Sequence, residues 1–170
     1  MPLRLMVFID GSNILHSSQR FKPGFKIDYV KLIKELVGGR NLIRPYFYCA
    51  HKVPPDNKEV KFHEALKRQG VAVVTRRLRQ RGDQLIEKGV DVALVTDMLG
   101  MAFKNAYDVA VLVSGDEDFV GAVDDIKRLG KRVEVAAFEF AASRELKLMA
   151  DHFVPLESLA SKIELKIQAR

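Results

Sequence analysis

The sequence predicts an α/β fold in which a central, mainly parallel sheet of five or six strands carries helices on both faces. Two observations predict this fold class. Short apolar runs alternate with stretches of helical spacing along the 170 residues, which is typical of repeated strand–helix units. Several runs are apolar almost throughout, as expected of parallel strands buried on both faces. Right-handed crossovers between such strands then produce a three-layer sandwich.

The strands are predicted from the apolar runs and from the turn residues that bound them. The first run ends at Asp10-Gly11-Ser12-Asn13, which is predicted to be a turn. The third run leads into the basic segment Arg76 to Gly82, for which a solvated charged loop is the alternative to a phosphate-binding segment. A short edge strand is predicted at His152 to Pro155. The remaining predicted strands are Leu3 to Ile9, Leu42 to Ala50, Val71 to Thr75, Asp108 to Ser114 and Arg132 to Phe138.

The helices are predicted from apolar residues spaced three and four apart. Glycine ends three of them, at Gly38, Gly70 and Gly130, as is common one residue past a helix. The loop Pro54-Pro55-Asp56-Asn57 supplies a capping residue for one helix. The predicted helices are Ile27 to Val37, Lys58 to Gln69, Val90 to Asn105, Glu117 to Leu129, Ser143 to Ala150 and Glu157 to Lys166.

Bulk composition limits the class of protein. A chain of 170 residues fits one domain, predicted to span 1–170 with a C-terminal helical extension at 156–170. The formal net charge of +6 and the pI near 9.5 favour a polyanionic partner such as nucleic acid, although many basic proteins have none.

The sequence also indicates a compartment and a redox state. No run approaches the roughly 18 apolar residues of a membrane span. Asp10 interrupts the N-terminal apolar run too early for a signal sequence. A cytoplasmic protein without a membrane partner is therefore expected by elimination. The single cysteine, Cys49, excludes an internal disulfide and lies in an apolar run, so it is predicted to be a buried structural thiol.

Acidic residues follow two of the predicted strands at their carboxyl ends. Asp10 follows the first strand, and Asp116 and Asp118 follow the strand that ends at Ser114. Parallel sheets bind ligands at this edge. One such aspartate is commonly just a helix cap, but carboxylates that converge repel each other unless a positive charge lies between them. The pattern therefore predicts a divalent cation site.

A further acid, Asp91, stands at the start of the helix predicted from Val90. Its helical neighbours Leu94, Val95 and Met98 are apolar, so Asp91 is expected on the core-facing side, where a carboxylate is costly unless paired or metal-bound. Complementing the helix dipole is the simpler alternative. Asp97 is expected to be peripheral to the acidic cluster or bonded to a backbone group.

Three segments together resemble the NYN domain, and more narrowly its LabA-like branch within the PIN-like nuclease superfamily. They are Phe8 to Asn13, Lys88 to Leu94 and Ser114 to Phe119, and the resemblance extends from Leu3 to about Phe138. It implies a PIN-like (Rossmannoid) sheet and a metal-dependent ribonuclease that uses Mg²⁺ or Mn²⁺. The residues that match the family's acidic positions, and so its expected metal ligands, are Asp10, Asp91, Asp116 and Asp118.

The resemblance also assigns supporting residues. Asn13 matches a conserved asparagine and is expected to hold the scissile phosphate or to orient a water, and Ser114 matches a small hydroxyl residue. The residues expected to contact RNA phosphates are Ser12, Ser114, Arg76, Arg77, Arg79, Arg81 and Lys88. PIN nucleases often carry a further acid on an early helix, for which Asp28 and Glu35 are unremarkable candidates. A homodimer stays open, because small nucleases of this type are often dimeric.

Three alternatives compete with the ribonuclease hypothesis. A haloacid-dehalogenase-type phosphatase needs a second aspartate two residues after Asp10, where Ser12 stands. A Toprim-type site expects glutamate instead of Asp10 on the first strand. A PIN-like module that binds RNA or a protein without cutting anything stays open.

Overall fold

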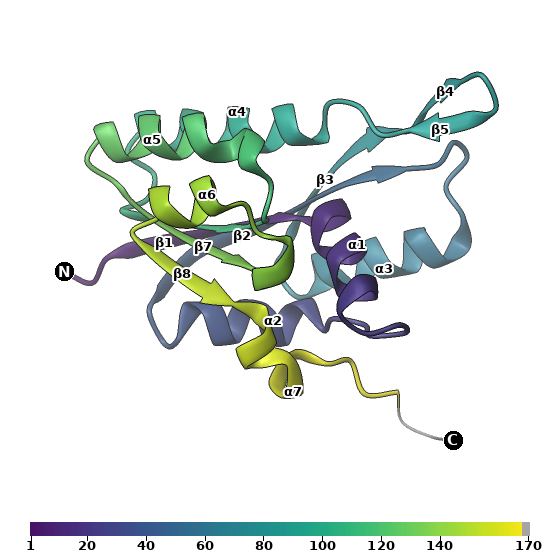
Figure 1. The fold of residues 1–170 in the computed structure, drawn as a ribbon, viewed down its shortest axis with the longest axis horizontal. Helices are drawn as coiled ribbons and strands as arrows, with labels where there is room; N and C mark the ends of the chain where they lie inside the picture. Colours follow the sequence, from purple (N-terminus) through teal and green to yellow (C-terminus); the bar gives the residue numbers. More distant parts are fainter. Residues whose placement is uncertain (168–170) are drawn as a thin grey trace.

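Six parallel strands form the central sheet of the computed structural model, which describes residues 1–167. The strand order is β3-β2-β1-β6-β7-β8 (Figure 1), and every neighbouring pair is parallel. The predicted parallel sheet is therefore confirmed, including the short edge strand. These strands are β1 Arg4–Asp10, β2 Asn41–His51, β3 Ala72–Arg77, β6 Val109–Val113, β7 Arg132–Ala137 and β8 His152–Pro155.

Helices cover both faces of this sheet, which gives the predicted three layers (Figure 1). One face packs against α1, α2, α3 and α7, and the other against α4, α5 and α6. In β1, Leu5 and Val7 face the first layer while Met6 and Phe8 face the second, so the strand is apolar between Arg4 and Asp10. The helices are α1 Gly11–Phe21, α2 Tyr29–Val37, α3 Asn57–Arg68, α4 Val90–Phe103, α5 Val120–Arg128, α6 Arg144–Met149 and α7 Ala160–Ile163.

Helix α1 corrects the prediction that residues 10–13 form only a turn. Asp10 caps this helix, because its carboxylate accepts a hydrogen bond from the backbone N–H of Asn13 at 3.3 Å. The buried residues of α1 are Gly11, Ile14, Ser17 and Ser18. Small polar residues on the buried side hide the apolar spacing from which a helix is predicted.

The basic segment is not an irregular loop. β3 continues to Arg77, and a two-stranded antiparallel hairpin follows, formed by β4 (Arg79–Arg81) and β5 (Gln84–Ile86). Gly82 has a positive φ of 62° in the tight turn between them. The hairpin projects away from the main sheet (Figure 1).

The predicted C-terminal helix is shorter than expected. A 3-10 helix, η3 (Leu156–Leu159), precedes α7, and the backbone then forms an isolated bridge between Glu164 and Ile27. Residues 168–170 of the predicted extension lie outside the described residues. Likewise the helix predicted from Glu117 starts with the 3-10 turn η1 (Glu117–Phe119), and the second 3-10 helix, η2, spans Glu139–Ala141. In the described part of the chain no helix has the length and apolar character that crossing a membrane needs.

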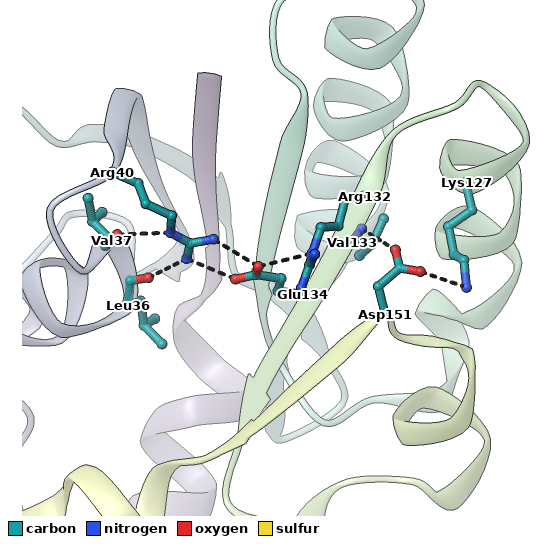
Figure 2. A network of polar contacts seen from close by, with 8 residues as sticks. All are labelled: Leu36, Val37, Arg40, Lys127, Arg132, Val133, Glu134 and Asp151. Carbon is teal, nitrogen blue, oxygen red and sulfur yellow. Dashed lines mark hydrogen bonds and ion pairs between the residues drawn. The ribbon is translucent and has the colours of Figure 1, made fainter. Parts of the chain in front are cut away.

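An ion pair between the buried Glu134 and the partly exposed Arg40 connects β7 to the end of α2 (Figure 2). Glu134 on β7 is only 5% exposed, and both its oxygens accept hydrogen bonds from Arg40, at 2.8 and 2.9 Å. The same guanidinium donates to the carbonyl groups of Leu36 and Val37 at the end of α2. Arg40 therefore compensates the buried charge and the open end of the helix together.

Candidate functional site

The carboxylate of Asp10 lies at the junction of β1 and β6. Its side chain is buried, with 7% exposure. One oxygen accepts the Asn13 N–H at 3.3 Å, and the other accepts the hydroxyl of Ser114 at 3.0 Å. Because β1 and β6 are neighbouring parallel strands, their carboxyl ends meet, which brings Asp10 and Ser114 together.

A hydrogen-bond network continues from Ser114 into the loop after β6. The side-chain oxygen of Asn13 accepts the Gly115 N–H at 3.1 Å. The Ser114 hydroxyl oxygen accepts the Asp116 N–H at 3.3 Å, and an Asp116 oxygen accepts the Asp118 N–H at 3.0 Å. These bonds fix the two strand tips relative to each other.

Glycine is required at both tips for steric reasons. A Cβ on Gly115 would lie 2.8 Å from the Ala141 carbonyl oxygen and 2.9 Å from the Cα of Ala142. A Cβ on Gly11 would lie 2.5 Å from the Phe47 ring. The backbone of each tip thus packs where no side chain fits.

The electrostatics of Asp10 are unfavourable to its ionised form. Burial is the main cause, and it raises the pKa of Asp10 to about 6. The bonds from Asn13 and Ser114 lower this pKa, while the negative charges of Glu87 and Asp116 raise it. Two neighbouring carboxylates therefore add to the cost of ionising Asp10 at this edge of the sheet.

Glu87 is a site residue that the sequence pattern does not single out. Its carboxylate accepts a hydrogen bond from the Ser12 hydroxyl, in the first turn of α1. It follows β5 directly and precedes Lys88, which is exposed. The one signal for Glu87 in the sequence is its place next to the Lys88-Gly89-Val90-Asp91 segment.

The prediction that Asp91 lies on the core-facing side of its helix is wrong. Asp91 is exposed in the first turn of α4, whose buried residues are Val90, Ala93, Leu94, Met98 and Ala102. The helix is apolar on nearly all sides, so apolar neighbours do not identify its buried face. A carboxylate in the first turn suits the helix dipole. The Asp97 carboxylate accepts the Tyr48 hydroxyl at 2.9 Å, so its partner is a side chain and not a backbone group.

The predicted set of four metal-binding carboxylates is not brought together. Asp118 is exposed in η1, like Asp91 in α4. Within residues 1–167, no three or more His, Cys, Asp or Glu side chains are grouped closely enough to hold a metal ion. The network around Asp10 and Asp116 is what the structure assembles.

Two of the predicted phosphate-binding arginines end a strand of the central sheet, and two lie in the hairpin that follows it. Arg76 and Arg77 end β3, opposite Ala50 and His51 at the end of β2. Arg79 and Arg81 are the first and last residues of β4 in the hairpin, and all four arginines are exposed. The predicted burial of Cys49 is confirmed, and burial raises the pKa of its thiol to about 12.

A model of the NYN domain matches residues 4–157. The chain belongs to the NYN domain family. The matched range contains the whole central sheet and both strand tips of the site. Since this family lies within the PIN-like nuclease superfamily, the resemblance predicted from the three segments is confirmed at that level.

Two known proteins are similar to this NYN domain. The low amplitude and bright protein LabA of Synechococcus elongatus is 29% identical over 173 residues, which covers 96% of this chain and 89% of LabA. The crystal structure of a protein of unknown function from Vibrio parahaemolyticus has the same fold, with a TM-score of 0.81 and 24% identity. That match covers 96% of this chain and 97% of the other.

The oxygen donors of the NYN site fit a hard divalent cation that is bound by only a few protein ligands. Mg²⁺ usually binds proteins through one or two carboxylates, with waters and substrate phosphates completing its shell. Asp10 and Asp116 supply two carboxylates, and the oxygens of Asn13 and Ser114 lie in the same network. All of these donors are hard oxygen atoms.

Proposed function

We propose that this NYN domain is a metal-dependent ribonuclease that hydrolyses RNA phosphodiester bonds. The observation that carries the proposal is the buried Asp10 carboxylate, bonded to Ser114 and influenced by the charges of Glu87 and Asp116. A fold does not need several acids around a buried carboxylate, because their repulsion is unfavourable. Membership of a nuclease superfamily supplies the chemistry that would use them.

Asp10 and Asp116 are the residues that we propose to hold Mg²⁺ or Mn²⁺. When bound, such an ion supplies Lewis-acid polarisation of a phosphate and acidifies a water molecule. Asp10 is positioned for this by two hydrogen bonds, and Asp116 by the backbone bonds of its own loop. Asp91 and Asp118 are exposed, and we include them in the proposal because they match acidic positions of the family.

The remaining residues would orient the RNA. The oxygen of the Asn13 amide accepts the Gly115 N–H, so the amide nitrogen is the end that can donate to a phosphate oxygen. Ser12 and Lys88 flank Glu87 and would contact neighbouring phosphates. The exposed arginines of β3 and the hairpin would bind the phosphate backbone further along the strand.

One observation favours a second candidate, a module that binds RNA or a protein without cutting. The carboxylates of the described residues do not form a group of three that could hold a metal ion. A domain of this kind would keep the basic hairpin and lack catalysis.

A cleavage assay separates the two candidates. Purified protein with Mn²⁺ or Mg²⁺ should cut single-stranded RNA, and chelator should stop the reaction. Asp10→Asn and Asp116→Asn should each abolish cutting while the fold survives, and Asp125→Asn, an exposed acid on α5, should cut normally. If both site variants cut at the wild-type rate, the activity comes from another site or a contaminant. RNA binding without any cutting would establish the second candidate.

A further inference from the structure

A cavity of about 450 Å³ lies beside the acidic site. It is lined by side chains of α1, β2 and α3, among them Leu15, Phe47, Phe62 and His63. Small-molecule sites typically have volumes of roughly 300 to 1,000 Å³ and mostly apolar walls with a few polar groups. We call this cavity the α1–α3 pocket.

The α1–α3 pocket shares a wall with the acidic site. Gly11 and Ser12, which line it, directly follow Asp10, and the Ser12 hydroxyl bonds to Glu87. Tyr29 also lines the pocket. Burial is the main cause that raises the pKa of Tyr29, and the charges of Cys49 and Asp10 raise it further. A ligand that spans the first turn of α1 would therefore contact both places.

Aromatic rings form the apolar part of the pocket. The Tyr29 and Phe47 rings lie 4.8 Å apart, and the Phe47 and Phe62 rings 5.6 Å apart, both in edge-to-face contact. Tyr29 and Phe47 are buried, whereas Phe62 is 39% exposed and Leu15 58% exposed. The latter two leave an apolar surface at the pocket on which a flat ring can lie.

The polar groups of the pocket suit a neutral hydrogen-bonding ligand. The His63 Nε2 lies 3.3 Å from the Cys49 sulfur. Burial lowers the pKa of His63, which favours the neutral imidazole. Among the described residues that line the pocket, Lys26 is the one cation and Glu59 the one acid. A flat heteroaromatic ring with donors and acceptors on its edge matches this combination.

We propose that the α1–α3 pocket binds a nucleobase of a single-stranded RNA whose backbone passes the acidic site. The inference rests on the proposed function, because RNA is the proposed substrate. Base–aromatic stacking tolerates different bases, since every base has a flat face that can lie on an aromatic ring. The pocket would thereby set where along the strand the scissile phosphate lies.

The test measures nucleotide binding without catalysis. The metal-free protein, kept in chelator, is titrated with each of the four ribonucleoside monophosphates and with ribose 5-phosphate, which has no base. NMR signals of His63 and of the Phe62 ring report on the pocket. At least one nucleotide should shift these signals in a saturable way, and ribose 5-phosphate should leave them unchanged.

Two variants and one control test the location. Leu15→Glu places a charge at an exposed pocket position and should weaken nucleotide binding about tenfold or more. Phe62→Leu removes the aromatic face and keeps most of the apolar volume, so it should weaken binding while a thermal melt confirms folding. Leu148→Glu changes a 73% exposed leucine on α6, on the other side of the sheet, and should bind like wild type.

The results separate this proposal from the ribonuclease proposal. If the protein cuts RNA but no nucleotide shifts the pocket signals, the ribonuclease proposal stands and the pocket proposal is wrong. If ribose 5-phosphate shifts the signals equally, or Leu15→Glu binds like wild type, the pocket proposal is also overturned. Nucleotide binding that both variants weaken supports the pocket, whether or not the protein cuts RNA.

Discussion

Among single residues, Asp10 makes stability depend on pH. Its ordinary pKa is 3.8, and burial, assisted by the charges of Glu87 and Asp116, raises the pKa in the folded protein to about 6. Between these values the folded protein holds a proton that the unfolded chain has released. The free energy of unfolding therefore falls as pH rises through this window, and the destabilisation is complete above pH 6.

Asp10→Asn should make the metal-free protein more stable above pH 6, by at most about 3 kcal/mol. Asparagine is also a good helix cap, so α1 keeps its N-terminal acceptor. Near pH 4 the advantage should disappear. Urea unfolding in chelator from pH 4 to 8 measures this. A pH-independent difference would contradict the ionisation argument.

Asp108→Asn is the matched control, for which the expected change in the free energy of unfolding has the opposite sign. Hydrogen bonds from Arg4 lower the pKa of Asp108 to about 2, so its charge stabilises the folded protein above the ordinary pKa. This variant should be less stable than wild type at pH 7. The deficit should shrink as pH falls toward 2.

Gly115→Ala should destabilise the protein, by about 1 to 3 kcal/mol, because the new methyl group would meet the backbone of Ala141 and Ala142 at under 3 Å. Gly121→Ala is the control. Gly121 is exposed in α5 with open space around it, so alanine should add up to about 1 kcal/mol through helix propensity. Denaturant unfolding compares both variants, and equal effects would mean that the β6 tip is not tightly packed.

At the scale of elements, the β4–β5 hairpin is the proposed phosphate-binding arm. Replacing Arg79 and Arg81 with alanine should weaken binding of single-stranded RNA equally for all sequences. The slope of log affinity against log salt should fall by up to about 0.7 for each phosphate that the variant no longer neutralises. The exposed pair Arg68 and Arg128, on α3 and α5, is the control. An unchanged slope in the hairpin variant would place the RNA elsewhere.

The same hairpin shows why some elements escape prediction. The central strands are predictable because burial on both faces makes them apolar throughout, as in β6. Strand β4 is exposed and polar, with the sequence Arg79-Gln80-Arg81, and β5 has only three residues, so neither strand shows an apolar pattern long enough to predict it. Helix α1 escapes prediction for a related reason, because Ser17 and Ser18 lie on its buried side.

At the scale of the whole molecule, the site follows from strand order. The sequence predicts that Asp10 and Asp116 follow parallel strands, which places both at one edge of the sheet. It does not predict that β6 is the neighbour of β1, nor that the hairpin returns Glu87 to Ser12. The exposure of Asp91 depends on how α4 is rotated against the sheet, which an almost uniformly apolar helix does not reveal.

The strand order also determines when the site can exist during synthesis. Leu5 of β1 pairs with Val109 of β6, about a hundred residues later in the chain. At roughly 5 to 20 residues per second, a ribosome needs about 5 to 20 s to make that distance. Until then one edge of an apolar strand is unpaired, which invites association with other nascent chains. Asp10 lacks Ser114 over the same interval, so unfinished chains carry no assembled acidic site.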